Sequence, residues 1–193
     1  RQVFVSGVTG GVGIISLMLF NKLGFDVTAI TGKMDQEKLL KDLGAKTVLD
    51  RNDLDSDLIS PLQKPIYAGG IDAVGGKILS NLICSTSQRA AIACCGLVGG
   101  LSLDTSIFPF ILRGLSLFGI DSAESLLETK EEVWNNFATS WKLENIDENI
   151  KDISLNELPS EIDKILDGKQ IGRVRIVYDL SLIHISEPTR LRL

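Results

Sequence analysis

The sequence is poor in the side chains that most often carry acid–base and metal chemistry. It has one histidine, His184, and three cysteines in 193 residues. Residues 1–183 therefore have no imidazole that could serve as a catalytic base or a zinc ligand. Two of the cysteines, Cys94 and Cys95, are neighbours whose side chains would point to opposite faces of a strand, which argues against a disulfide framework. We expect all three cysteines to be reduced and packed as small apolar side chains.

Positive charge and long apolar runs are also scarce. The net charge is −5, from 20 basic and 25 acidic residues, and the two signs are interspersed. This argues against a nucleic-acid-binding surface, which needs clustered lysine and arginine. No apolar run reaches transmembrane length, and no signal peptide is recognisable. We therefore expect a cytoplasmic protein with no nucleic-acid or membrane partner.

Both ends of the chain look unlike the ends of a domain. Apolar residues 3–5 follow directly on Arg1 and Gln2, so the sequence begins inside an expected strand, and we interpret it as a fragment. The stretch LSLIHISEPTR, residues 180–190, resembles a translated sequencing-library adapter. We expect residues 180–193 to be such an artefact, with a natural tail as the alternative, and exclude them from the fold.

Short apolar runs alternate with helix-period segments over residues 1–122, for which 44% apolar content overall supplies a core. The runs predict strands at residues 3–5, 26–30, 47–49, 71–74, 90–94 and 115–120. One helix is expected at residues 12–23, ended by Gly24. A second is expected after Asp35, which could cap it, with Leu39, Leu40 and Leu43 on one face and Gly44 at its end. This alternation predicts an α/β fold of the Rossmann type, a doubly wound parallel sheet with ligands at the carboxyl ends of its strands.

The pattern changes after that domain. Apolar and aromatic residues at helical spacing from Leu126 to Trp141 predict an amphipathic helix, and we expect its two tryptophans to be packing anchors. A shorter helix is expected at residues 158–166 and a strand at residues 172–179. We expect residues 123–179 to be an incomplete unit, a helix and strand that return into a mostly missing domain.

The stretch SGVTGGVG, residues 6–13, joins the first strand to the first helix. Gly10 would let the backbone approach a pyrophosphate, Gly13 would allow close helix packing, and the helix start offers unpaired N–H groups. Val8 stands where a strict G-x-G-x-x-G has its first glycine. The turn predicts a dinucleotide site, with a purely structural tight turn as the alternative. A Walker phosphate loop is disfavoured, because no Gly-Lys is followed by Ser or Thr.

The end of the second strand indicates which dinucleotide is preferred. A fold that prefers NAD places an acidic residue there for the ribose hydroxyls. This chain has Thr31, Gly32 and Lys33 instead. Lys33 could pair with a 2′-phosphate and Thr31 could donate a hydrogen bond to it, so NADPH is favoured over NADH. Lys33 as a solvated loop charge is the alternative, and Asp35 is the residue that could reverse the preference.

Several motifs occur in the order seen in one known family. They are SGVTGGVG, TGKMDQEKLLKDLGAK, IDAVGGKIL, CCGLVGG, FPFILRG, LFGIDS and GKQIGRVRIVYD, spread over residues 3–179. They resemble the zinc-independent branch of the medium-chain dehydrogenase/reductases, and most of all its acryloyl-CoA reductase subgroup of NADPH-dependent, quinone-oxidoreductase-like proteins. That branch tolerates a residue such as Val8 in the first glycine position.

The resemblance implies a set of cofactor-binding residues. The pyrophosphate would be contacted by Thr9, Gly10, Gly11 and Val12; the adenosine 2′-phosphate by Thr31, Gly32, Lys33 and Arg51; the nicotinamide side by Leu97, Ile111 and Ser122; and the cofactor would be reached from the C-terminal segment by Arg173. Lys33 stands where arginine is common, which keeps the charge but loses the bidentate fork. We therefore expect a weaker phosphate contact than an arginine would give.

The resemblance further implies an oxidoreductase that transfers hydride from NADPH to the β-carbon of an activated alkene, most specifically acryloyl-CoA, to give propanoyl-CoA. The catalytic residues would lie in a GroES-like domain that this fragment lacks, so none is assigned here. A quinone or enone reductase is one alternative, and an NADPH-binding module without catalysis is another. No zinc site is expected, the substrate would be an enoyl-CoA or a quinone, and the full-length protein would be a homodimer.

A short-chain dehydrogenase is disfavoured, because neither Tyr67 nor Tyr178 has a lysine four residues later, and we expect both to be packing residues.

Overall fold

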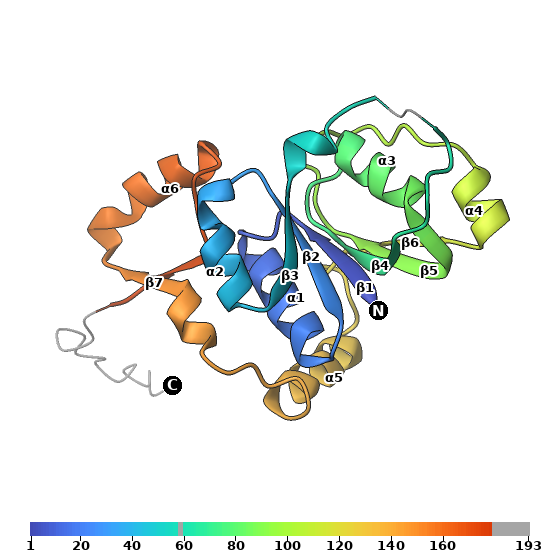
Figure 1. The fold of residues 1–193 in the computed structure, drawn as a ribbon. Coiled ribbons are helices and arrows are strands. Elements are labelled where there is room, and N and C mark those ends of the chain that lie inside the picture. Colours follow the sequence, from blue (N-terminus) through green and yellow to red (C-terminus); the bar gives the residue numbers. More distant parts are fainter. Residues whose placement is uncertain (58–59, 179–193) are drawn as a thin grey trace, which may run out of the picture.

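The computed structural model describes residues 1–57 and 60–178, so the predictions for Asp179, His184 and the tail 180–193 lie outside the described residues. Its centre is a six-stranded sheet whose neighbouring strands are all parallel (Figure 1). The strands are β1 (Gln2–Ser6), β2 (Asp26–Thr31), β3 (Ala45–Asp50), β4 (Tyr67–Asp72), β5 (Thr86–Cys94) and β6 (Ser116–Gly119). Their order across the sheet is β3-β2-β1-β4-β5-β6. The chain therefore builds one half of the sheet from β1 outward to β3, then crosses to β4 and builds the other half outward to β6. The predicted doubly wound Rossmann-type sheet is confirmed.

The helices cover both faces of this sheet. The α-helices are α1 (Gly11–Lys22), α2 (Glu37–Asp42), α3 (Gly76–Cys84), α4 (Phe108–Arg113), α5 (Leu127–Ala138) and α6 (Leu158–Leu166), and the 3-10 turns are η1 (Met34–Gln36), η2 (Arg51–Asp53), η3 (Ile146–Asn149) and η4 (Leu155–Glu157). Val3 and Val5 of β1 are buried in a cluster with Leu17 of α1 and Leu40 of α2. Phe4, between them, belongs to a second cluster, with α3 and part of α4. This two-residue alternation places α1 and α2 on one face and α3 and α4 on the other.

Three details of the sheet domain differ from the sequence prediction. Helices α3 and α4 were not expected, and the fourth strand covers Tyr67–Asp72 rather than residues 71–74. Strand β5 begins at Thr86, four residues before the expected start, because its register against β4 shifts between Tyr67 and Gly69. Arg89 adopts a positive φ of 57° within this irregular stretch. Such a bulge allows the polar residues before the apolar run to belong to the strand. The apolar run alone predicted a later start for the strand.

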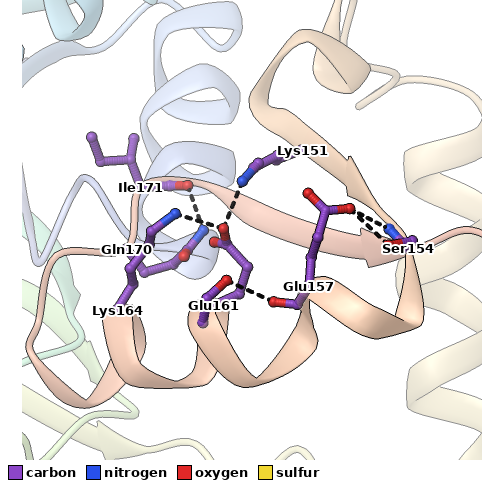
Figure 2. A network of polar contacts seen from close by, with 8 residues as sticks. Lys151, Ser154, Glu157, Glu161, Lys164, Gln170 and Ile171 are labelled. Atoms are coloured by element: carbon purple, nitrogen blue, oxygen red, sulfur yellow. Dashed lines mark hydrogen bonds and ion pairs between the residues drawn. The ribbon is translucent and has the colours of Figure 1, made fainter.

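The C-terminal part forms a second, two-stranded parallel sheet. Strand β7 (Ile150–Ile153), which the sequence did not suggest, pairs with β8 (Arg173–Ile176), and α6 connects them. The carboxylate of Glu161 on α6 is buried and receives hydrogen bonds of 2.6 Å from both Lys151 of β7 and Lys164, as Figure 2 shows. These ion pairs attach α6 to β7.

The aromatic residues of this part are less buried than predicted. Helix α5 contains no buried residue, and Trp134 is 72% exposed, so its predicted role as a packing anchor is wrong for the described residues. Its ring lies 6.4 Å from Phe137, which in turn meets Trp141 edge to face at 5.8 Å. Tyr178 is also exposed, whereas Tyr67 is buried against Phe4 as expected. No helix within the described ranges is both long and apolar enough to cross a membrane.

Candidate functional site

The turn between β1 and α1 has the form of an anion site. Gly7 takes a positive φ of 60°, and the Gly10 amide donates to the Gly7 carbonyl at 3.0 Å. Helix α1 begins without a side-chain cap, and within the described residues no backbone hydrogen bond is donated by the amides of Val12 and Gly13. Unpaired amides at the start of a twelve-residue helix attract negative charge. The turn can therefore hold a phosphate group.

The departure from a strict glycine pattern at Val8 has a structural explanation. Its side chain is fully buried in the cluster shared by β1, α1 and α2. Gly13, at the other end of the turn, has no room for a side chain, because a Cβ there would lie 2.5 Å from the Val8 Cα. The backbone approach that the motif requires is thus provided at Gly13, while the Val8 position contributes apolar packing.

Two cations meet where β2 and β3 end. Arg51, directly after β3, lies over Gly32, since a Cβ on Gly32 would be 2.5 Å from the Arg51 Nε. The buried Thr31 hydroxyl accepts a hydrogen bond of 3.0 Å from the Lys33 amide. Burial, and then the charge of Arg51, lower the pKa of the Lys33 ammonium, while Asp35 acts in the opposite direction. A bound phosphate would offset the repulsion between the two cations.

The C-terminal segment reaches both of these places. The Gly172 amide donates to the Thr9 carbonyl at 2.9 Å, and Gly172 forms a parallel bridge with Gly10. The Arg173 side chain covers Gly11, whose added Cβ would meet the Arg173 Cγ at 2.9 Å. The structure therefore brings Arg173 to the glycine turn from 162 residues away.

A cavity of about 750 Å³ opens beside the turn. The residues from the predicted site that line it are Gly11, Val12, Ser122 and Arg173. Its remaining wall is mostly apolar and includes Trp134 and Phe137 of α5. Ser122 and the turn thus border the same cavity, and contact of Ser122 with a nicotinamide stays a prediction.

Two of the predicted site residues, Leu97 and Ile111, are not among the residues that line this cavity. Leu97 follows β5 at the carboxyl edge of the sheet, and its side chain is exposed. Ile111 lies on α4, which is held through Arg113 by hydrogen bonds to the carbonyls of Cys84 and Thr86, before and at the start of β5. The Ile111 side chain is exposed. Contact of either residue with a nicotinamide stays a prediction.

One buried group at the reversal point of the sheet was not found from the sequence. Asp72 ends β4, and its carboxylate accepts from the Ser6 hydroxyl at 2.6 Å and from the Gly75 amide at 2.8 Å. The Ser6 oxygen in turn accepts from the Ala73 amide. Asp72 therefore joins the ends of β1 and β4 beside the glycine turn. An aspartate after an apolar run is common, so only the buried partners could have identified it.

The cysteines and acids near the site do not form a metal centre. Cys84 is buried and Cys94 is partly buried, but Cys95 is exposed, so the expected packing is wrong for Cys95. Cys94 and Cys95 both lie near Asp72, and loss of solvation raises the pKa of each thiol, with the Asp72 charge adding to it. Neutral thiols are poor metal ligands and poor nucleophiles. Among the described residues, no three His, Cys, Asp or Glu side chains are grouped so that they could hold a metal ion.

Comparison with known proteins places these features in one family. The family profile of the zinc-binding dehydrogenases matches residues 11–139. The chain is 37% identical over 174 residues to a Bacillus subtilis protein named as a quinone oxidoreductase, covering 90% of the chain and 53% of the relative. It is 34% identical over 172 residues to the acrylyl-CoA reductase of Ruegeria pomeroyi, covering 89% and 52%. The chain thus spans about half the length of the curated relatives it matches.

Solved structures show the same similarity in three dimensions. An Escherichia coli protein, YhdH, solved with bound NADPH, matches with a TM-score of 0.86 and 34% identity over 91% of this chain and 55% of its own. The Bacillus subtilis protein, solved with NAD, matches with a TM-score of 0.85 and 37% identity over 90% and 53%. Although the family name refers to zinc, the described residues of this chain do not fit a zinc site. They do fit a dinucleotide, through the open amides of α1 and the glycines beneath Arg51 and Arg173.

Proposed function

The chain belongs to the family of zinc-binding dehydrogenases, and on that premise we propose that it is the nucleotide-binding part of an NADPH-dependent reductase of activated carbon–carbon double bonds. Residues 1–122 would form the NADPH-binding domain, and residues 123–179 would return to a second domain. The most specific form of the proposal is reduction of acryloyl-CoA to propanoyl-CoA. The observation that carries the cofactor proposal is the pair of neighbouring cations after β2 and β3: Arg51 lies over Gly32, and its charge acts on the Lys33 ammonium.

Each of the proposed binding groups has a distinct task. The open amide of Val12 would bind the pyrophosphate, with Thr9, Gly10 and Gly11 shaping the turn beside it and Arg173 adding a positive charge above it. Thr31, Gly32, Lys33 and Arg51 would bind the 2′-phosphate. Leu97, Ile111 and Ser122 would border the nicotinamide. When bound, the nicotinamide supplies the hydride, and the chain's part is to hold and orient it.

The substrate proposal rests on the relatives. The Ruegeria pomeroyi relative is named for acrylyl-CoA, and the Bacillus subtilis relative, slightly more similar, is named for quinones. A quinone reductase is therefore the second candidate. Both reactions need a site that excludes water beside the nicotinamide, and the mainly apolar wall of the 750 Å³ cavity supports either.

The cofactor preference is tested by binding NADPH and NADH to the complete gene product that contains this chain. We expect NADPH to bind at least tenfold more tightly than NADH, because a charge-assisted hydrogen bond contributes roughly 1.5–3 kcal/mol. Lys33→Ala should remove most of this preference, and Lys33→Arg should retain or increase it. Lys38→Ala is the matched control, since the Lys38 side chain is 90% exposed and pairs with Asp42. Equal binding of NADH, or an unchanged preference in Lys33→Ala, would show that the phosphate-site proposal is wrong.

The substrate is tested by following NADPH oxidation with acryloyl-CoA, crotonyl-CoA and a benzoquinone in turn. The proposal requires the highest kcat/KM with acryloyl-CoA. A highest value with the benzoquinone would favour the second candidate. Tight NADPH binding with no turnover of any of the three would favour a binding module without catalysis.

A further inference from the structure

The segment formed by residues 170–173 crosses the carboxyl ends of two neighbouring strands. Beyond β1, its Gly172 amide binds the Thr9 carbonyl, and Arg173 covers Gly11. Beyond β2, its Gln170 carbonyl accepts a hydrogen bond from the Lys33 Nζ at 2.5 Å. One segment thus contacts both the pyrophosphate turn and the 2′-phosphate loop of the proposed cofactor site.

We propose that the Gln170 carbonyl is a positioning group that sets the preference for NADPH over NADH by holding the Lys33 ammonium in one place beyond the end of β2. This inference rests on the NADPH site proposed above. An unrestrained lysine loses the freedom of four rotatable bonds when it binds a phosphate, and this loss of conformational entropy weakens the binding. Lys33 has already lost that freedom in the contact with Gln170, so less affinity is lost on binding.

The hydrogen-bonding capacity of the ammonium permits both contacts together. A lysine ammonium has three donors and no acceptor. One donor is used by the Gln170 carbonyl, which leaves two for phosphate oxygens. The Arg51 guanidinium over Gly32 supplies the second cation of the site. The Gln170 carbonyl is neutral and does not compete electrostatically with a phosphate, so it can orient Lys33 without displacing the ligand.

The segment is held firmly enough to position a side chain. On one side it follows α6, which Glu161 attaches to Lys151 of β7 (Figure 2). On the other side it enters β8, which pairs with β7 from Arg173 to Ile176. Gln170 itself is fixed by a hydrogen bond of 3.0 Å from its Nε2 to the Ile171 carbonyl, also drawn in Figure 2.

A first test displaces the segment and measures the ratio of the NADH and NADPH dissociation constants in the complete gene product. Gly172 has a positive φ of 64°, and a Cβ there would collide with the Asn149 carbonyl oxygen. Gly172→Ala should therefore move the segment off the 2′-phosphate loop and lower the ratio several-fold. Gly168→Ala is the matched control, because Gly168 has a similar φ of 67° but open space around it. It should leave the ratio unchanged.

A second test weakens the Gln170 carbonyl alone. Replacing Ile171 by its α-hydroxy acid turns the peptide bond into an ester, whose carbonyl is a poorer acceptor, and keeps every side chain. The Ile171 amide lost in this change donates no hydrogen bond to any described residue. NADPH affinity should fall about two- to fivefold, the loss expected for one weakened hydrogen bond, while NADH affinity stays the same.

The outcomes separate this inference from the proposed function. In a Lys33→Met background, both changes should leave the ratio unaltered, since there is no ammonium left to position. If either change weakens NADPH and NADH equally, or if the ester leaves both affinities unchanged, Gln170 does not set the preference and the inference is wrong. If the unaltered protein binds neither cofactor, the proposed function itself fails.

Discussion

At the scale of single residues, Gly13 is the position where the glycine turn is least tolerant. A Cβ there would lie 2.5 Å from the Val8 Cα and 2.8 Å from its carbonyl carbon, and both are backbone atoms that cannot rotate away. Gly119 on the edge strand β6 is a useful contrast, because nothing lies within 4 Å of its added Cβ. The same substitution therefore meets backbone atoms at Gly13 and open space at Gly119.

We predict that Gly13→Ala destabilises the protein and weakens dinucleotide binding, whereas Gly119→Ala changes neither by a large factor. Overpacking of this kind costs typically about 1–3 kcal/mol, because α1 must shift away from the turn. Denaturant unfolding followed by circular dichroism gives the stability, and an NADPH titration gives the binding. Equal stability of the two variants would mean that the turn can relax without cost.

The sequence could predict a site residue where its role depends only on the residues next to it in the chain. Thr31, Gly32 and Lys33 could be assigned to one loop because they follow a strand directly. The cluster of Lys33 with Gln170 could not, since 137 residues separate the two and a backbone carbonyl has no sequence signature. Asp72 was missed because its role depends on its hydrogen bonds with Ser6, which is 66 residues earlier, and with the Gly75 backbone amide.

At the scale of elements, the junction of α6 with β7 depends on one buried carboxylate. Hydrogen bonds from Lys151 and then Lys164 lower the pKa of Glu161 below its ordinary value of 4.5. A carboxyl group whose pKa is lower in the folded state stabilises that state above its unfolded pKa, and the contribution is lost as pH falls through the folded pKa. The α6 junction should therefore weaken in acid.

We predict that the difference in unfolding free energy between the unaltered protein and Glu161→Gln is largest near neutral pH and shrinks as the pH is lowered below about 4.5. The glutamine cannot pair with two ammonium groups at any pH, so it removes the linkage. Asp163→Asn, on an exposed position of α6, is the control and should show no such difference. A difference that is independent of pH would indicate that Glu161 acts through packing alone.

Element prediction succeeded where periodicity was strong and failed where another signal was needed. Helix α1 was expected at residues 12–23 and covers Gly11–Lys22, because apolar residues fill it and Gly24 ends it. Helix α3 was missed although its apolar residues are regularly spaced, because the consecutive glycines at its start, Gly75 and Gly76, are typical of a loop in the sequence. In the structure both have a positive φ. Strand β7 was missed because it has only four residues, of which the two central ones, Lys151 and Asp152, are charged, and because its partner β8 lies beyond α6 in the sequence.

At the scale of the whole molecule, the chain gathers its proposed binding groups at one edge of the sheet and leaves an apolar surface on α5. The carboxyl ends of β1, β2 and β3 carry the turn, the Lys33 loop and Arg51, and the 170–173 segment joins them. Helix α5 has no buried residue, and beside Trp134 the side chains of Leu126 and Leu127 are 71% and 66% exposed. Exposed apolar patches of this kind promote association.

We predict that the 193-residue chain on its own self-associates as its concentration rises, with the α5 surface as a main contact. Sedimentation velocity over a range of concentrations measures this directly. Trp134→Glu places a charge in the patch and should shift the distribution toward monomer, because burying that charge in an apolar contact is costly. Glu132→Gln, an exposed change elsewhere on α5, should leave association as it was or slightly increase it. A chain that stays monomeric and unfolds cooperatively at high concentration would contradict the prediction, and it would mean that residues 123–178 are complete enough to cover the sheet domain without a further partner.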